Sequence, residues 1–383
     1  MAARRALRTL ALLLVTIALG AVPARATEPT SAGIQTPPPA RNYFYDPTAD
    51  YGVQALYSPL YVLVNRGFDI VQAEAGRRQI FRYPWGPNLR NVADNVLHFP
   101  SRVSEYGWGN FLKEEILPLT WSTQNARWVP NYSLHLVGGG MTYRMLREWF
   151  EDKGVPLGWL WSSAVVMVSA FINEALENSG STGRNTDSIA DIVFFDLGGI
   201  LLFSWDLVPR LFSRYLHLAD WSLQPAFTLP EGRLHNVGNY FALRIDIHDP
   251  VSFFGYFGNG TWAGISWRVH GEERVSLAGG VFNSRLVGSI EHKTQLNSVV
   301  LTSTAGIFWD RNGTPLASLI FRDVFDQRFA LNIYPGVILP GKWSPGVWAV
   351  AARDGSFAFG VSAGFGFGVG IGVESPGMRA LDP

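Results

Sequence analysis

The sequence predicts an α+β protein in which a helical N-terminal module precedes an antiparallel, transmembrane-type β-barrel of about 10 strands. The first observation is composition: only 16% of the 383 residues are charged, against roughly 25% in an average soluble domain. The second is a change near residue 220 from helix-like spacing of apolar residues to alternation of apolar and polar ones. The expected divisions are a signal peptide (1–26), a linker (27–42), the helical module (43–220), the barrel (221–374) and a tail (375–383).

The first 26 residues are interpreted as an export signal. Basic residues precede an apolar run of 13 residues, Leu10 to Val22, and small residues follow it at Ala24 and Ala26. That run is shorter than the roughly 20 residues with which a helix crosses a bilayer, so cleavage is favoured over a retained anchor. Residues 27–42, rich in Pro, Thr and Ala, are expected to be a disordered linker.

Charge and cysteine content exclude several classes of protein. The 31 basic and 31 acidic residues balance, so the chain lacks the basic footprint of a nucleic-acid-binding protein. Cysteine is absent, which excludes disulfides, thiolate metal sites, a cysteine nucleophile and a cysteine-linked lipid. An exported chain of this composition fits the outer membrane of a Gram-negative cell, with membrane lipids and the outer-membrane assembly machinery as partners and no cofactor. A soluble periplasmic sandwich is the alternative.

Three apolar segments of the helical module are expected to be helices. They are Ser133–Phe150, Leu157–Glu177 and Asp187–Trp205, and a polar turn rich in Gly and Ser separates the last two. A run of 18 uncharged residues, Val155–Ile172, overlaps the second segment and is nearly long enough to span a bilayer. An inner-membrane protein is therefore the rival to the barrel.

Five polar residues near the ends of these helices form the candidate catalytic set: His135, Glu174, Glu177, Asp187 and Asp191. The two Glu residues are three positions apart and the two Asp residues four apart, so each pair shares a helical face. In this hypothesis Glu174 or Asp191 is a general base, and His135 is an acid or a ligand of an unknown metal. The alternative is a structural polar network or a solvated turn, in which acids are ordinary.

The same segment carries a resemblance. Its residues run in the order Pro130-Asn131-Tyr132-x-x-His135, then Gly138–Gly140, Glu174-x-x-Glu177, Asp187 with Asp191, and Gly198-Gly199. This order resembles a family of bacterial envelope proteins of unknown function, which shows an Asn-Pro-Tyr/His motif, a Trp-Glu/Glu helix and an Asn-Asp-Leu helix ending in Gly-Gly, often before a predicted barrel. The resemblance covers residues 128–210. Here Pro precedes Asn131 and no Trp immediately precedes Glu174, and the family implies no established activity.

Three dipeptides in the C-terminal region are typical of hairpin turns: Asn259-Gly260, Asn312-Gly313 and Asp354-Gly355. Strands are expected at Gln224–Thr228, Asn239–Ile247, Ser252–Phe257, Trp262–Val269, Val275–Phe282, Leu286–His292, Val299–Phe308 (with Thr304–Trp309 bordering the second turn), Leu316–Phe321, Arg328–Tyr334 and Val347–Ala351. From Ser356 to Val373, large apolar residues occupy every odd position and small ones every even position. This pattern predicts one strand whose bare face lets a helix or plug approach closely.

The favoured function is non-enzymatic: an outer-membrane structural or small-pore barrel whose helices plug or brace it. The alternative is a membrane-apposed hydrolase or transferase that acts on an envelope lipid or cell-wall ester through the His/Glu/Asp set. The sequence patterns of common enzyme active sites give little support to an enzymatic function. The G-x-S-x-G match at residues 360–364 lies inside an expected strand rather than at a strand-to-helix elbow.

Overall fold

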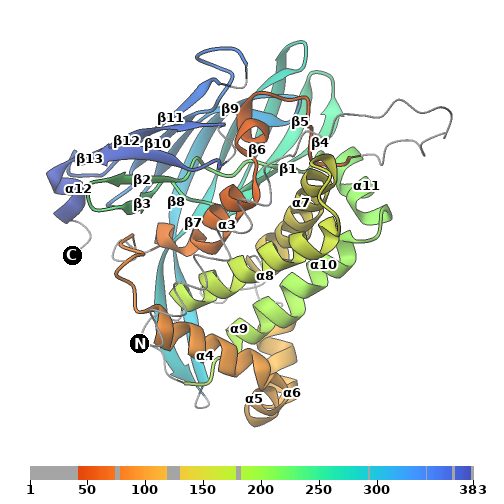
Figure 1. The fold of residues 1–383 in the computed structure, drawn as a ribbon, viewed down its shortest axis with the longest axis vertical. Coiled ribbons are helices and arrows are strands. Elements are labelled where there is room, and N and C mark those ends of the chain that lie inside the picture. Colours follow the sequence, from red (N-terminus) through yellow and green to blue (C-terminus); the bar gives the residue numbers. More distant parts are fainter. Residues whose placement is uncertain are drawn as a thin grey trace.

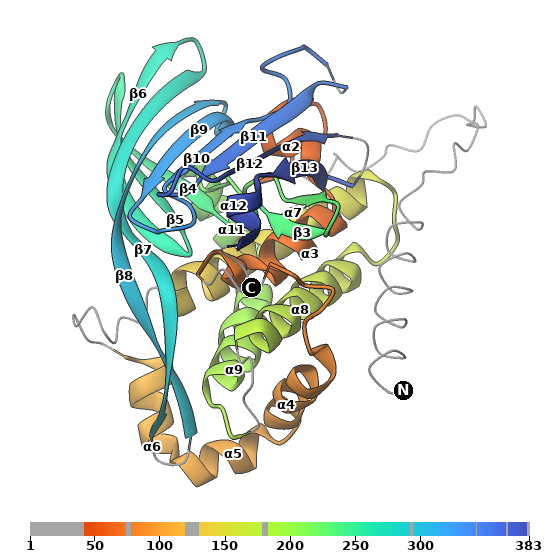
Figure 2. The ribbon, with the colours of Figure 1, turned by 90° about the vertical axis from the view of Figure 1, so that its left-hand side faces the viewer.

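The computed structural model describes residues 42–73, 78–118, 130–177, 183–291, 294–341, 343–364 and 367–380. The expected signal peptide and nearly all of the expected linker lie outside these residues. A bundle of helices packs against a large curved sheet, so the α+β class is confirmed (Figure 1). The β7–β8 hairpin extends beyond the rest of the sheet, to the level of α5 and α6 (Figure 2).

The first part of the helical region is a series of short helices. They are α2 (Gly52–Leu56), α3 (Pro59–Gly67), the 3-10 helix η1 (Asp69–Ala73), α4 (Trp85–Leu97), α5 (Phe99–Tyr106), α6 (Trp108–Phe111) and the π-helix η3 (Leu112–Ile116). The start of α3 follows from its sequence, because Ser58 accepts a hydrogen bond from the Tyr61 amide at 3.1 Å and proline occupies the first turn. This cap fixes the direction of α3, which carries Asn65 to the sheet and Arg66 to Asp196 of the helical module.

The three longer helices form close to where the sequence predicts them. They comprise η4 (Pro130–Gly139) continuing into α7 (Gly140–Asp152), then α8 (Gly158–Glu177), then α9 (Asp187–Ile189) continuing through η5 (Ala190–Asp196) into α10 (Leu197–Phe203), with α11 (Leu207–Arg214) following. Glycines let two of them touch. An added Cβ at Gly199 would lie 3.0 Å from the Gly140 nitrogen, and one at Gly140 would lie 2.8 Å from the Gly199 oxygen. The sequence did not reveal that η4 and η5 are π-helices.

The long apolar helix α8 lies in the centre of the helical module. Of the described residues, it is the one helix long and apolar enough to cross a membrane alone; the segments Asp187–Phe203 and Leu207–Arg214, bent by 87°, would be a second if counted as one span. However, 56% of the apolar stretch of α8 is buried inside the protein. It packs against α3, α4 and α7, which accounts for its apolar composition without a bilayer.

Thirteen strands form one mostly antiparallel sheet. They are β1 (Ala219–Asp220), β2 (Ala226–Leu229), β3 (Arg233–His235), β4 (Phe241–His248), β5 (Val251–Gly258), β6 (Gly260–His270), β7 (Glu273–Glu291), β8 (Thr294–Arg311), β9 (Thr314–Arg322), β10 (Phe329–Ile333), β11 (Pro345–Ala351), β12 (Phe357–Ala363) and β13 (Gly370–Glu374). The order is β1-β4-β5-β6-β7-β8-β9-β10-β11-β12-β13-β2-β3. In this order the sheet is not closed, and β1 and β3 lie at its two ends. A short helix, α12 (Pro376–Ala380), occupies the expected tail.

All three expected turns lie between neighbouring paired strands, but only Asn312-Gly313 has the two positive φ values predicted for the dipeptides: neither Asn259 nor Gly260 has one, and at Asp354-Gly355 only the glycine does. Asn312 and Gly313 have φ values of 50° and 76°, the positive values that a type I′ turn requires, and they join β8 to β9. Asn259 joins β5 to β6 between the paired residues Gly258 and Gly260. Gly355, with φ of 86°, lies in the link between β11 and β12.

The alternating segment from Ser356 to Val373 is not one strand, which corrects the prediction. It forms the antiparallel pair β12 and β13, in which Phe359 pairs with Val373 and Gly360 with Gly372. Odd-numbered residues therefore oppose odd-numbered ones, and the alternation of faces continues across the turn. Because a hairpin of this register preserves the pattern, alternation cannot reveal the turn. Phe365 and Gly366 within the link lie outside the described residues.

The two faces of the sheet differ. Inner residues pack into an aromatic core that includes Trp221, Tyr240, Phe254, Tyr256, Trp262, Phe308 and Trp348. Added Cβ atoms at Gly360 and Gly372 would lie 2.8 and 2.7 Å from Cζ2 of Trp348. The close approach predicted for the glycine face therefore exists. At Gly360 and Gly372 an inward tryptophan makes it. At Gly368 the helices make it, since an added Cβ there would collide with the Leu56 oxygen of α2 and would lie 2.7 Å from Cβ of Tyr61 in α3. The outer face carries exposed apolar side chains.

Candidate functional site

A buried polar cluster lies where the two π-helices η4 and η5 pack together. η4 carries His135, and η5 carries Asp191 and Asp196. A π-helix is rare and occurs mostly as short insertions in α-helices, frequently at functional sites. All three residues are buried in the helical module. The buried polar side chains thus lie on the two π-helical segments.

His135 lies between two carboxylates. Its Nε2 is 3.6 Å from Oδ2 of Asp191, and its Nδ1 is 3.3 Å from Oδ1 of Asp196. Arg66 of α3 forms an ion pair with the same Asp196 and so ties the first helices to the cluster. An imidazole with a carboxylate at each nitrogen can hold a proton on either side and pass it between them. Both distances are longer than the roughly 2.6–3.2 Å of a proton-transfer contact, so the side chains would have to move closer before a proton could pass.

The acids deeper in the cluster favour their protonated forms. Burial raises the pKa of Glu174 well above its usual range, and the neighbouring charges of Glu177 and Asp187 raise it further. Burial likewise raises the pKa of Asp191, with Asp187 and Glu174 adding to the effect. Oδ1 of Asp191 makes no hydrogen bond among the described residues. Because one arginine faces several acids, the cluster retains protons rather than full negative charge.

Asp69 connects the helices to the sheet. Its Oδ1 accepts hydrogen bonds from the Asn239 amide at 2.7 Å and from Nε2 of Gln72 at 2.9 Å. Oε1 of Gln72 in turn accepts from the Tyr240 hydroxyl at 2.8 Å. Burial raises the pKa of Asp69 to about 7, although the Asn239 amide and Arg66 act to lower it. A polar path therefore leads from the helical module into the interior of the sheet.

The structure brings the five predicted residues together. His135 contacts Asp191 directly, and Glu174, Glu177, Asp187 and Asp191 are near enough to act on one another electrostatically. Sequence reasoning missed three further members: Asp196, Arg66 and Asp69. Asp69 and Asp196 are charged residues between apolar neighbours, which was the available signal, whereas Arg66 lies between Asn65 and Gly67 and gave no such signal. Asp196 lies five positions after Asp191, a spacing that shares a face in a π-helix but not in the α-helix that was assumed.

No metal site can be assigned to this cluster. Within residues 42–380, leaving out the undescribed gaps, no group of three or more His, Asp or Glu side chains is arranged to hold a metal ion. The ligand role considered for His135 has no geometric support there. The predicted acid or base roles of His135, Glu174 and Asp191 stay predictions.

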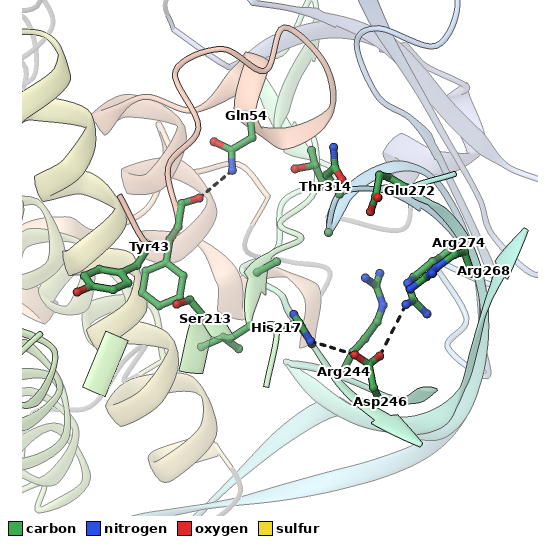
Figure 3. A pocket seen from close by; sticks show the side chains of 15 residues that line it. Tyr43, Gln54, Ser213, His217, Arg244, Asp246, Arg268, Glu272, Arg274 and Thr314 are labelled. Carbon is green, nitrogen blue, oxygen red and sulfur yellow. Dashed lines mark hydrogen bonds and ion pairs between the residues drawn. The ribbon is translucent and has the colours of Figure 1, made fainter. Parts of the chain in front are cut away.

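A second polar region is a cavity of about 370 Å³ at one end of the sheet, next to the end of α11 (Figure 3). Charged residues of β4, β6 and β7 line it, together with His217 and the segment around Tyr43. Sequence reasoning did not find this region. The available signal was the placement of Arg244, Arg268 and Arg274 at inner positions of the alternating strands.

Comparison of the chain with family models, curated proteins and solved structures found no match in any of the three. The resemblance of residues 128–210 to an envelope family stays a prediction. Inferences about function therefore rest on the geometry of this chain alone.

Proposed function

We propose that this protein is a structural protein of the outer membrane, in which the sheet closes into a membrane-spanning barrel and the helical module braces it from the periplasm. The observation that carries the proposal is the apolar outer face of the sheet. Along β4 to β13, large apolar residues stand exposed at alternate positions: Ile245, Ile247, Phe253, Ile265, Trp267, Val269, Leu277, Val281, Ile307, Phe329, Leu331, Phe357, Phe359, Val361, Ile371 and Val373.

This outer face is costly in water and favourable in lipid. Ile247 is 64% exposed, Leu277 53% and Ile371 58%, although these strands are far apart in the sheet. Soluble monomers rarely expose contiguous apolar patches of more than a few hundred Å². Apolar residues that alternate with inward polar or small ones are typical of strands that face lipid. A bilayer is the partner that would cover an apolar face running around so many strands.

Closure into a barrel is supported by the register of the first strands. Ala219 pairs with Ala242 in β1·β4, and Ala226 pairs with His235 in β2·β3. The second pairing therefore continues the first without a shift in register. Between them, the Trp221 amide donates to the Tyr240 oxygen at 2.8 Å and the Leu223 amide to the Gly238 oxygen at 2.9 Å. Residues 219–229 and 233–248 can therefore be counted as two long strands, which reduces the thirteen strands to eleven.

The opposite edge of the first long strand also has a partner. β13 pairs with β2 in parallel, Gly370 with Ala226 and Val373 with Leu229. Neighbouring strands that alternate in direction can close on themselves only if their number is even. A barrel of eleven strands thus needs one parallel pair, and β13·β2 supplies it. The odd number departs from the even counts of most bacterial outer-membrane barrels.

The packed interior supports a structural role over a small pore. Trp262, Phe308 and Trp348 point inward and are at most 1% exposed. Inner glycines make room for them, since Cβ atoms at Gly360 and Gly372 would collide with Trp348. Small barrels filled by side chains leave no aqueous channel. We therefore expect the protein to conduct no ions.

The helical module supports the sheet through specific polar contacts. The Tyr61 hydroxyl donates to the Ser222 oxygen at 2.9 Å, and Nδ2 of Asn65 donates to the Leu223 oxygen at 3.0 Å. Oδ1 of Asn65 also accepts from the Gly238 amide at 3.0 Å. These bonds satisfy buried backbone groups of the first two long strands, where an unpaired group would be costly. α3 thereby braces the place where the barrel closes.

Membrane fractionation tests the proposal. The full-length exported protein is expected to sediment with outer-membrane markers and to migrate faster on gels before boiling than after it. Purified protein in planar bilayers is expected to leave the conductance at the level of protein-free controls. Recovery with inner-membrane or soluble periplasmic markers would contradict the membrane assignment, and stable single-channel steps would contradict the structural role.

A second candidate, a hydrolase or transferase acting on an envelope lipid or cell-wall ester, is favoured by the position of His135 between two carboxylates. His135→Ala and Asp191→Ala are then expected to alter the envelope lipid or cell-wall ester profile without changing protein abundance. The matched control is His98→Ala, which removes an exposed histidine paired with Asp94. Unchanged profiles at normal abundance would assign the cluster to a structural network.

A further inference from the structure

The cavity at the end of the sheet presents three guanidinium groups to one space. Arg244 comes from β4, Arg268 from β6 and Arg274 from β7, and all three line the cavity of about 370 Å³. Figure 3 shows their side chains directed toward one another, with His217 and Asp246 beside them. Cavities of this size are typical of small-molecule sites.

Two of these arginines oppose each other directly. Arg268 and Arg274 are register partners in β6·β7, so two like charges lie side by side on the inner face. Like charges directly opposite each other destabilise a sheet. Each has a carboxylate partner on one side, Arg268 with Asp249 at 3.1 Å and Arg274 with Asp246 at 3.7 Å. An anion between the two groups would reduce the remaining repulsion, because each guanidinium can bind an oxyanion through paired N–H donors.

Arg244 completes the cationic side. It is 6% exposed, and its Nη2 lies 2.5 Å from Oδ1 of Asp310. Its Nε makes no hydrogen bond among the described residues. A buried guanidinium donor without an acceptor is costly, and an oxyanion in the cavity would satisfy it.

The carboxylates around the cavity are of two kinds. Asp246 pairs with His217 at 3.4 Å and with Arg274 at 3.7 Å, so it is already balanced. Glu272 lines the cavity from the turn between β6 and β7 and forms no ion pair with any described residue. The cavity thus offers a cluster of cations and, at a separate point, one uncompensated carboxylate.

We propose that this cavity binds a phosphate ester that carries a primary ammonium group, as in an ethanolamine-phosphate headgroup, with the phosphate on Arg244, Arg268 and Arg274 and the ammonium on Glu272. A tetrahedral phosphate has enough oxygens to accept from all three guanidinium groups. Ligand and site are both of mixed charge, so no large excess charge is buried.

A membrane lipid is the source that the surroundings favour. On β4 the cavity residues Arg244 and Asp246 alternate with outward Ile245 and Ile247, which are 45% and 64% exposed. On β6, Trp267 faces outward next to Arg268, and tryptophan is enriched at the membrane–water interface. The apolar outer face therefore reaches the rim of the cavity. The lipid source rests on the proposed membrane location, whereas the headgroup chemistry does not.

Calorimetric titration of the full-length protein in detergent tests the site with O-phosphoethanolamine, phosphocholine and inorganic phosphate. We expect O-phosphoethanolamine to bind most tightly, because phosphocholine cannot donate a hydrogen bond to Glu272 and phosphate lacks the ammonium. Arg268→Gln should weaken it about tenfold or more, the usual effect of losing a charge-assisted hydrogen bond. Glu272→Gln should remove the preference over phosphocholine. Arg268 is chosen because Arg244 neutralises a buried aspartate.

Arg353→Gln is the matched control, since Arg353 is a half-exposed arginine paired with Asp323 elsewhere on the sheet, as Arg268 is paired with Asp249. Unchanged affinity in Arg353→Gln supports the site. Equal affinity for phosphocholine, or unchanged affinity in Arg268→Gln, would overturn the proposal. In mixed phosphatidylcholine and phosphatidylethanolamine vesicles, enrichment of phosphatidylethanolamine on the wild type but not on Arg268→Gln supports the lipid source. Binding of the soluble compound without this enrichment would overturn the lipid source and assign a soluble ester.

Discussion

Asp69 is a carboxylate shared between the helical module and the sheet. It accepts hydrogen bonds from an amide of the sheet and from a side chain of its own helix, yet it is 5% exposed. Burial makes its proton hard to lose, so its pKa rises to about 7 from a value near 4 in an unfolded chain. The folded protein therefore binds a proton that the unfolded chain releases between about pH 4 and pH 7.

Asp69→Asn is predicted to flatten the pH dependence of stability. Since the folded state binds the extra proton, the stability contributed by this group is present at low pH and is lost as the pH rises through about 7, a change of a few kcal/mol. Asn keeps the Oδ1 acceptor and removes the titration. Thermal unfolding in detergent at pH 5 and pH 8 measures this: the wild type should be less stable at pH 8, and Asp69→Asn should show a smaller difference.

Asp354→Asn is the control for this prediction. Asp354 is exposed, and a hydrogen bond from the Ser356 amide at 2.9 Å lowers its pKa, so its charge does not change between pH 5 and pH 8. The variant should keep the wild-type difference between the two pH values. If Asp69→Asn kept it as well, Asp69 would not be the group that titrates.

Some residues of the candidate site could be predicted from the sequence and others could not. His135, Glu174 and Asp191 could be found because charged or titratable residues within apolar helices must have partners when buried. Asp196 and Arg66 could not be placed, since their contact depends on the π-helical turn of η5 and on how α3 packs against it. Asp69 depends on the amide of Asn239, far away in the sequence. Tertiary contacts of this kind leave no local pattern.

At the scale of elements, β12 and β13 explain a limit of sequence patterns. Alternation predicted the faces of both strands correctly, with Phe359 outward and Gly360 inward. It did not predict the turn, because the register of the hairpin pairs odd with odd residues. Turns marked by Asn-Gly, as at Asn312, could be predicted from the positive φ that these residues favour.

Gly360→Leu is predicted to disrupt assembly more than Phe359→Leu. The glycine faces Trp348, and a larger side chain there must displace a packed indole or the backbone of β13, at a cost of about 1–3 kcal/mol or more. Phe359 faces outward, where leucine displaces no packed side chain. The fraction that stays compact on unboiled gels measures the difference. Equal fractions in the two variants would contradict the packed interior.

At the scale of the whole molecule, the parallel pair β13·β2 decides whether the sheet is a barrel. The chain has no cysteine, so any disulfide in a variant with two introduced cysteines must join those two positions. Ile371 and Phe227 are register partners across this pair. Neighbouring strands lie about 5 Å apart, a separation that a disulfide spans.

The double variant Ile371→Cys and Phe227→Cys is predicted to form a disulfide when the folded protein is treated with an oxidant. The control double variant joins Ile371→Cys with Leu277→Cys on β7, which is not a neighbour of β13. Non-reducing gels should show the shift of a closed chain for the first pair and none for the second. An absent or equal shift would contradict the pairing on which closure depends.

The same parallel pair has a consequence for how the protein assembles. The first long strand follows directly after the helical module, and its second edge is covered only when β13, near the end of the chain, arrives. Until then the edge at residues 226–229 offers unpaired backbone groups, the kind of edge on which chains aggregate. In the folded protein, Tyr61 and Asn65 of α3 bind the backbone of Ser222, Leu223 and Gly238, and the same contacts formed early would hold these residues against α3 during this interval. The helical module would thus act as an internal chaperone, keeping the first strand in place for the last.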